Sequence, residues 1–412
     1  MAHVLGRYEL LRPLALGGMA EVYLARRRAA GVEKRLVVKR MRPETARSPR
    51  LRELFVREAR LSMALVHQNI VPVFDFGKVD DEIYLAMERV EGKDLGVSLA
   101  RAQTHRLPPM LAAYVAAECC QALDYAHRRK GPDGVPLGIV HRDVTPRNVL
   151  VSWSGEVKLT DFGIAALAGD VPSRLLGTPH YMAPEQARRE PIDPRADIYA
   201  IGLVLREAVS GICPRPGTDH ETTLDAARRA ELLPWSPRGT SGTSGCDAPV
   251  AGLATGSGLH TLPAELLDAE PLPAALVAII ERATAALPAD RYPDARSMLD
   301  DLDSFIVGER AAHKTAPPAR LLAAWLAAVW DGARDDIEAE VDAAAAQPVD
   351  RVDNGAVGAG TARSLAQTAD DAVDEPVAAG GSHGRPAATR PAWSSLPPAE
   401  NDDVVRGRAR GG

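Results

Sequence analysis

The sequence predicts an α+β fold made of a small β-rich part with one main helix and a larger helical part. Between Tyr8 and Leu85, short apolar runs alternate with turns, as they do in β-strands, and one stretch at Leu51–Val66 has helical spacing. After Leu95 the pattern becomes predominantly helical. We therefore expect a sheet that carries one helix, followed by a helical lobe.

Two strands and one helix define the β-rich part. Strands are expected at Val22–Ala25 and Leu36–Arg40, on either side of a turn near Gly31. The residues at positions i, i+4, i+7 and i+11 share one face of this helix. They are Leu54, Glu58, Leu61 and Leu65. Glu58 is therefore expected to point inward from this helix.

The helical part opens with a long alanine-rich helix. This helix is expected at Pro109–Arg129, and another at Ile198–Ser210 ends at Gly211. Between them, two short strands are expected at Val149–Ser152 and Val157–Thr160. The second lobe is therefore mainly helical and includes a small strand pair.

Later segments differ in composition. Residues 214–262 are rich in Gly, Ser, Thr and Pro and are interpreted as a flexible insertion, after which helices are expected at Pro273–Leu287 and Asp294–Phe305. Residues 318–346 are expected to form one helix, and the rest of the tail to be disordered. The apolar face of that helix can dock on the rest of the chain, which we favour, or on a partner.

Composition excludes several classes of function. A net charge of −6 disfavours nucleic acid as the main partner. The four cysteines do not have the paired spacing of a structural metal site. Residues 1–8 contain no apolar secretion signal, and the apolar stretch at Leu321–Trp330 is about half of the ~20 residues that cross a bilayer. We expect a cytoplasmic protein without a membrane anchor.

A small-residue turn between two strands is the first candidate for chemistry. The segment consists of Leu14, Ala15, Leu16, Gly17, Gly18, Met19, Ala20, Glu21 and Val22. Its backbone N–H groups can approach a phosphate chain closely. Taken alone, the segment is better explained as an ordinary hairpin turn.

Lys39 is the second candidate, because it ends the apolar strand run Leu36-Val-Val-Lys. An ammonium group beside buried strand residues needs an anion, and Glu58, nineteen residues on, is a suitable partner. Most lone Lys–Glu pairs lie on the surface, but this strand setting favours a lysine that is positioned for two phosphates.

The block from His141 to Asn148 reads His-Arg-Asp-Val-Thr-Pro-Arg-Asn and is followed by Asp161-Phe-Gly163. Asp143 and Asp161, eighteen residues apart with Asn148 between them, supply oxygen ligands for Mg²⁺ and a carboxylate for an incoming hydroxyl. An Asp-rich turn explains neither this spacing nor the downstream block at 177–185, Gly-Thr-Pro-His-Tyr-Met-Ala-Pro-Glu.

With these blocks in order, the sequence resembles the eukaryotic-like Ser/Thr protein kinases of bacteria over about Tyr8–Phe305. The resemblance implies the two-lobed protein kinase fold. It places a kinase domain at 8–306, with an N-lobe at about 8–88 and a C-lobe at about 91–306, and leaves residues 307–412 as a tail.

The resemblance implies a role for each motif residue. Asp143 would orient the substrate hydroxyl and accept its proton, while Asn148 and Asp161 would hold the magnesium ions. Lys39, held by Glu58, would bind the α- and β-phosphates of ATP. The implied nucleotide pocket and its hinge consist of Val22, Val37, Met87 as gatekeeper, Glu88 to Val90, Asp94 for the ribose, and Leu150. The implied scaffold consists of Asp197 under the catalytic loop and the pair Glu185 and Arg291.

The sequence departs from the family at two places. Ala15 and Ala20 stand where the family's turn usually has glycines, which should stiffen it and weaken ATP binding modestly. Thr145 stands where Ser/Thr kinases usually have a lysine, and Arg147 occupies a place where many tyrosine kinases have an arginine. We expect Arg147 to restore the missing charge at the γ-phosphate.

The resemblance implies transfer of phosphate from ATP, with Mg²⁺, to Ser/Thr hydroxyls of proteins in intracellular signalling. We expect the chain to phosphorylate itself as well. The Gly177-Thr178-Pro179 loop, in which Thr178 would contact Asp143, favours Ser/Thr over Tyr. Ser173 is the expected autophosphorylation switch, with Arg142 receiving its phosphate, unless the loop is ordered without one. The alternatives are a pseudokinase scaffold, a dual-specificity kinase and a small-molecule kinase of the same fold.

Overall fold

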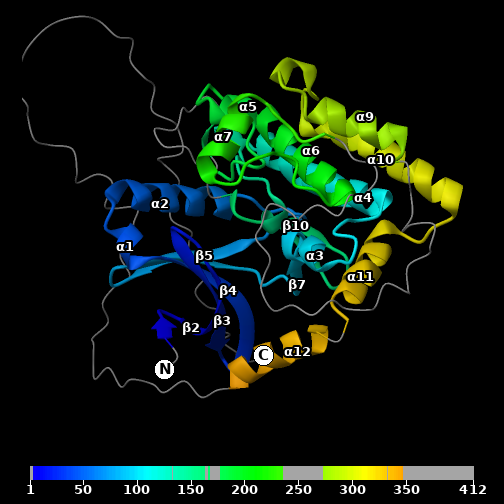
Figure 1. The fold of residues 1–412 in the computed structure, drawn as a ribbon. Helices are drawn as coiled ribbons and strands as arrows, with labels where there is room; N and C mark the ends of the chain where they lie inside the picture. The colour runs from blue at the N-terminus through cyan, green and yellow to red at the C-terminus, as the bar shows by residue number, and fades with distance from the viewer. Residues whose placement is uncertain are drawn as a thin grey trace, which may run out of the picture. The chain divides into compact units, whose positions relative to one another are not determined.

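The computed structural model describes residues 3–131, 133–162, 166–167, 177–234, 272–331 and 333–346 (Figure 1). Three predictions fall outside these residues. They concern Gly163, the Ser173 switch, and the tail beyond Ala346. Most of the predicted insertion, from residue 235 onward, is also outside them.

The N-lobe is built on one antiparallel sheet in the order β1-β2-β3-β4-β6-β5. Its strands are β1 His3–Leu5, β2 Tyr8–Leu16, β3 Ala20–Ala29, β4 Val32–Met41, β5 Val73–Val79 and β6 Glu82–Met87. Between β4 and β5 lie α1 Pro43–Ala46 and α2 Pro49–Met63. The predicted strands at 22–25 and 36–40 lie within β3 and β4, which are longer than predicted.

Alternation along β4 gives the sheet two different faces. Val37 pairs with Met87 and Lys39 pairs with Leu85, so these four side chains share one face. That face packs against a cluster that includes Phe55 of α2. The opposite face carries a second cluster, which contains Leu5, Tyr8, Leu10, Ala25, Leu36, Val38, Tyr84 and Ala86. Lys39 therefore points toward α2.

Helix α2 begins two residues earlier than predicted, because Pro49 occupies its first turn and the Ser48 side chain accepts a hydrogen bond from the Leu51 N–H. Glu58 is buried, as predicted. The buried face is centred on Phe55, Glu58 and Ala59, whereas Leu54 and Leu61 are half-buried. Leu65 is buried but lies beyond the end of the helix at Met63. The predicted leucine face was therefore partly wrong.

The C-lobe consists mainly of helices around α4, which is buried along most of its length. Its helices are α3 Leu95–Arg101, α4 Pro109–His127, α5 Pro184–Ala187, α6 Arg195–Ser210, α7 His220–Arg228, α9 Ala274–Ala283 and α10 Ala295–His313. Its short strands are β7 Gly92–Asp94, β8 Ile139–Val140, β9 Val149–Ser152, β10 Val157–Leu159 and β11 Ala166–Leu167. Helix α6 ends at Gly211, whose φ of 70° lies in the left-handed region that glycine tolerates.

Helix α7 corrects the interpretation of residues 214–262 as an insertion without packed elements. Asp219 forms a capping box with Thr222 at the start of this helix. Leu224 and Ala227 are buried against Met182 and Ala187. The Gly- and Ser-rich average of the whole segment concealed this nine-residue amphipathic stretch.

The segment after the domain forms two helices where the sequence predicted one. These are α11 Pro318–Val329 and α12 Ala333–Ala346, and Trp330 is the C-cap of the first (Figure 1). The sequence between them reads Asp331-Gly332, and both residue types disfavour a helix interior. No helix of the described part of the chain is long and apolar enough to cross a membrane.

Candidate active site

Sheet register and α2 together place Lys39. On β3 and β6 its neighbours are Val22 and Leu85. Its Nζ donates to Glu58 Oε1 at 2.7 Å and to Asp161 Oδ1 at 2.8 Å. Lys39 thereby joins a strand, a helix and the loop after β10, which the sequence separates by up to 122 residues.

The charges in this cluster are strongly coupled. Burial alone lowers the pKa of the Lys39 ammonium, but the carboxylates of Asp161 and Glu58 outweigh burial and raise that pKa above its usual value. Burial opposes ionisation of Asp161, yet Lys39 holds the pKa of this carboxyl below its usual range. Burial raises the pKa of Glu58, against the attraction of Lys39. The lysine therefore stays charged in the folded protein.

Asp143 lies in the loop that follows β8 and is fixed by donors on both carboxylate oxygens. The Thr178 backbone N–H and hydroxyl donate to Oδ1 at 2.9 and 3.0 Å. Asn148 Nδ2 donates to Oδ2 at 3.2 Å and to the Asp143 carbonyl at 2.8 Å. The predicted Thr178–Asp143 contact is present, and the carboxylate has a defined orientation.

Asp197 of α6 supports this loop from below. It is fully buried and accepts hydrogen bonds from the backbone N–H groups of His141 and Arg142, both at 2.8 Å. His127 Nε2 lies 2.8 Å from Oδ2. Burial opposes ionisation, but His127 and the backbone donors hold the Asp197 pKa below its usual range. Arg142 has a φ of 68°, a strained conformation for a non-glycine residue that these bonds maintain.

Asn148 connects the loop of Asp143 with the segment that carries Asp161. Its backbone carbonyl accepts from the Thr160 N–H at 3.0 Å, and Asp161 follows with a φ of 60°. Glu58 and Asp161 both contact Lys39, which leaves one negative charge in excess among these three groups. Within the described residues no three His, Cys, Asp or Glu side chains form a ready metal site, but carboxylate and carboxamide oxygens are the ligands that Mg²⁺ prefers, and Asp161 and Asn148 carry such oxygens.

Strand register also assembles the predicted nucleotide pocket. Val37 is paired with Met87 across β4 and β6, and Asp94 with Leu150 across β7 and β9. Val37, Val90 and Leu150 pack against the cluster that contains Met87. The Glu88 N–H is bonded to the Pro72 carbonyl at 3.0 Å. Val37, Met87, Val90 and Leu150 therefore lie together, and their role in nucleotide binding stays a prediction.

Asp94 has a structural role that the sequence did not predict. Its carboxylate caps α3 by accepting a hydrogen bond from the Val97 N–H at 2.8 Å. A ribose contact would share this carboxylate with the helix terminus.

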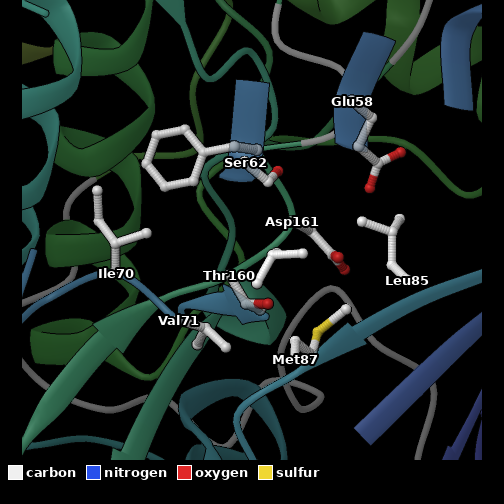
Figure 2. Close-up of a pocket in the computed structure, with 10 residues that line it drawn as sticks. Glu58, Ser62, Ile70, Val71, Leu85, Met87, Thr160 and Asp161 are labelled. Atoms are coloured by element: carbon white, nitrogen blue, oxygen red, sulfur yellow. The ribbon is translucent and has the colours of Figure 1, made fainter. Parts of the chain in front are cut away.

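A pocket lies behind Met87, next to the charged cluster (Figure 2). Figure 2 shows the carboxylates of Glu58 and Asp161 facing this space, together with the side chains of Leu85 and Met87. The pocket is otherwise lined by Ser62, Ile70, Val71, Val73, Thr160 and Phe162. Its charged lining residues, Glu58 and Asp161, both accept hydrogen bonds from Lys39, and Ser62 and Thr160 add hydroxyl groups.

Comparison with known proteins defines the family. Residues 8–241, more than half of the chain, match the family described as protein kinase domain. The chain belongs to the protein kinase family. The predicted two-lobed fold is confirmed by a solved protein kinase domain, that of PknI from Mycobacterium tuberculosis. It is 28% identical with a TM-score of 0.50, and the match covers 74% of this chain and 96% of that one.

Curated relatives are bacterial kinases, which confirms the resemblance found in the sequence. The tyrosine-protein kinase MasK of Myxococcus xanthus is 35% identical over 73% of this chain and 43% of its own length. The serine/threonine-protein kinase PknB of Mycobacterium tuberculosis is 36% identical over 60% of this chain and 40% of its own length. A probable PknB of Corynebacterium glutamicum is 40% identical over 51% and 32%. The chain thus spans less than half the length of these relatives.

The glycine turn of this kinase domain is held by few bonds. The Gly17 N–H donates to the Ala20 carbonyl at 2.9 Å, and the Met19 carbonyl accepts from the Arg42 N–H at 3.1 Å. Leu16 is 74% exposed. Ala15 pairs with Val22, whereas Ala20 is buried in the cluster with Phe55. Leu14, Gly18 and Glu21 belong to the same hairpin.

The two departures in the catalytic loop lie in different surroundings. Thr145 is buried, and Arg147 is exposed in the middle of a short 3-10 helix, Pro146–Asn148. The role of Arg147 at the γ-phosphate stays a prediction.

The scaffold of the kinase domain includes one predicted pair and one residue that was missed. Glu185 and Arg291 form a buried two-point ion pair at 2.7 and 2.9 Å, which confirms the predicted pairing. Buried Arg215 donates to the Pro179 and Met182 carbonyls at 2.6 and 2.8 Å and thereby supports the loop of Thr178. Its position in a Pro- and Gly-rich stretch gave no signal.

Proposed function

We propose that this chain transfers the γ-phosphate of ATP to serine or threonine hydroxyls of proteins, itself included. The observation that carries the proposal is the Asp143 carboxylate, oriented by Thr178 and Asn148 in a loop that Asn148 links to the segment of Asp161. A fixed carboxylate can orient an incoming hydroxyl and accept its proton.

The neighbouring residues supply the charge that phosphate transfer requires. Lys39, held by Glu58, would bind the phosphates of ATP. Asn148 and Asp161 would hold magnesium, which neutralises charge on the phosphate oxygens when bound. The adenine would lie between Val22, Val37 and Leu150, next to Met87 and the hinge at Glu88–Val90. Catalysis is then mainly positioning and charge neutralisation.

Specificity for serine or threonine is supported by the bond of the Thr178 hydroxyl to Asp143 and by the similarity to PknB proteins. Tyrosine or dual specificity is the second candidate, because a relative that covers 73% of the chain is named a tyrosine-protein kinase. Thr145 and Arg147 in the catalytic loop favour the same alternative.

The experiment that tests the function is incubation of the full chain with Mg-ATP and a generic protein substrate, followed by phosphoamino-acid analysis. Phosphoserine and phosphothreonine are expected, and they should be absent when Asp143→Asn replaces the wild type. Phosphotyrosine alone would overturn the specificity. Nucleotide binding without any transfer would instead indicate a pseudokinase scaffold.

Arg147→Ala should reduce turnover if its guanidinium replaces the missing lysine.

Regulation through Ser173 is part of the proposal. Arg142 is buried, and its carbonyl accepts from Gln186 Nε2 at 2.8 Å, so it is fixed beside the loop of Thr178. A phosphate on Ser173 would add charge that an arginine can bind. Mass spectrometry should find Ser173 modified in fully active enzyme, and an active enzyme with unmodified Ser173 would contradict the switch. The proposed location of this activity is the cytoplasm.

A further inference from the structure

Helix α11 is anchored in the core of the C-lobe. Leu322, Trp325 and Leu326 are buried there, so the apolar face that the sequence singled out docks on the kinase domain itself. Trp330 Nε1 lies 3.3 Å from Ser98 Oγ, and Arg101 Nε donates to the Val329 carbonyl at 2.9 Å. The start of α12 therefore has a fixed position next to α3.

From this anchor, α12 reaches the hinge and the N-lobe. Glu338 Oε2 accepts from Arg89 Nη2 at 2.6 Å, and Arg89 stands between the hinge residues Glu88 and Val90. Glu338 Oε1 accepts from the Trp153 indole N–H at 3.2 Å, on the C-lobe side. Farther along, Asp342 pairs with Arg35 of β4 at 2.5 Å. One helix thus contacts both lobes and the connection between them.

We propose that Glu338 is a positioning residue for the nucleotide site, which holds the hinge through Arg89 and fixes it to the C-lobe through Trp153. This inference rests on the proposed function, because it assigns the hinge to ATP binding. It concerns a helix outside the residues that match the protein kinase family.

The geometry around Arg89 supports this role. The Arg89 side chain is only 11% exposed and is held between Glu91 and Glu338. The Trp153 backbone N–H donates to the Glu91 carbonyl at 2.8 Å, so the indole and the backbone of one residue both fix the hinge. Burial opposes ionisation of Glu338, but Arg89 and Trp153 lower its pKa, so the carboxylate remains charged at neutral pH.

Loss of the carboxylate should weaken nucleotide binding rather than chemistry. Glu338 contacts no catalytic group, whereas the hinge backbone that it holds would contact the adenine. A loosened hinge has to be ordered again when the nucleotide binds, which lowers affinity. The size expected for one partly exposed charged pair is about three- to tenfold in the Kd of Mg-ATP.

The test compares Glu338→Gln with Asp336→Asn in the full chain. Asp336 is an exposed acid of the same helix with no ion pair among the described residues, so it serves as the matched control. Calorimetry should give a Kd of Mg-ATP raised about three- to tenfold for Glu338→Gln, with kcat nearly unchanged, and no change for the control. Hydrogen exchange at the Glu88 and Trp153 amides should also be faster.

A double-mutant cycle with Arg89→Gln tests whether Glu338 acts through Arg89. If it does, the double variant should have nearly the same Kd of Mg-ATP as either single variant. If Glu338→Gln does not fold, Trp153→Phe removes the indole N–H donor but leaves an aromatic side chain, and the same changes are expected. Unchanged affinity and unchanged hinge exchange in the folded variants would overturn the inference. A wild-type chain that binds no nucleotide would contradict the proposed function, and hinge exchange would still decide the role of Glu338.

Discussion

The catalytic loop at His141–Asn148 and the glycine turn at Gly17–Met19 would both serve the phosphates of ATP, yet they are built in opposite ways. In the loop, the backbone N–H groups of His141 and Arg142 both donate to the buried carboxylate of Asp197. Each carboxylate oxygen of Asp143 also accepts a hydrogen bond. The turn makes one short backbone bond across itself, and Arg42, the residue after β4, donates one backbone bond and one long side-chain bond of 3.5 Å to it; Leu16 beside it is largely exposed.

The difference follows from what each segment would do. A carboxylate that accepts a proton in the transition state has to be oriented before the reaction. The free-energy cost of this orientation is lowest when the surrounding scaffold already fixes the group. A backbone turn over the phosphates has to open for nucleotide exchange, so weak anchoring suits it. Substitutions should therefore have large effects on stability at the loop and small ones at the turn.

The largest effect is expected for Asp197→Ala. It would leave the His141 and Arg142 N–H groups and His127 without their buried acceptor, at a cost of about 3–5 kcal/mol in the free energy of unfolding. Urea unfolding measures this cost. As a control, Asp193→Ala removes a more exposed acid near the start of the same helix and should cost about 1 kcal/mol. Equal costs would show that the loop is not specially anchored.

Acid unfolding sharpens the same contrast. The pKa of Asp197 is lowered in the folded state, so its stabilising contribution is present above the pKa of the unfolded chain, about 3.9, and is lost as pH falls through the lower folded value. The free energy of unfolding of the wild type should therefore fall more steeply below about pH 4 than that of Asp197→Ala. Parallel curves would mean that Asp197 has no such role.

A smaller loss of stability is expected for Lys39→Met. Lys39 belongs to the strand next to β3 of the glycine hairpin and contacts Asp161. The substitution leaves the Glu58 and Asp161 carboxylates facing each other without their shared cation. Because Asp161 is partly exposed, the free energy of unfolding should fall by only about 2 kcal/mol. Mg-ATP affinity should also fall, which calorimetry measures. Undiminished affinity would remove Lys39 from the phosphate site.

The smallest effects are expected in the glycine hairpin. Ala20→Gly removes a buried methyl group from the cluster with Phe55 and should cost about 1 kcal/mol. Ala15→Gly, at an exposed strand position, should cost about 0.5 kcal/mol. Both should change the Kd of Mg-ATP less than threefold, as urea unfolding and calorimetry can check. A large change in affinity would mean that the two alanines restrict the conformations of the turn that bind nucleotide.

Candidate site residues could be predicted from the sequence where a residue type and its local setting both indicate the same chemistry. Lys39 at the end of an apolar strand, Glu58 in a helix and the spacing of Asp143, Asn148 and Asp161 each indicate chemistry without knowledge of the fold. Strand register places Lys39, whereas its contacts depend on the position of α2 and of the loop after β10.

Contacts between distant polar residues had no such signal. Glu338 and Trp153 are separated by 185 residues, and neither belongs to a periodic pattern. The capping role of Asp94 was hidden because the same residue fits a ribose contact. Arg215 was missed because its buried position depends on the packing of α6, not on its neighbours in the sequence.

Asp143 is the residue on which the account depends most. Its most direct test is single-turnover phosphate transfer by Asp143→Asn at saturating Mg-ATP, with the Kd of Mg-ATP measured on the same sample. We expect the transfer rate to fall at least about 1,000-fold while the Kd of Mg-ATP changes less than about threefold. A rate within tenfold of the wild type, or a loss fully explained by weaker nucleotide binding, would contradict it.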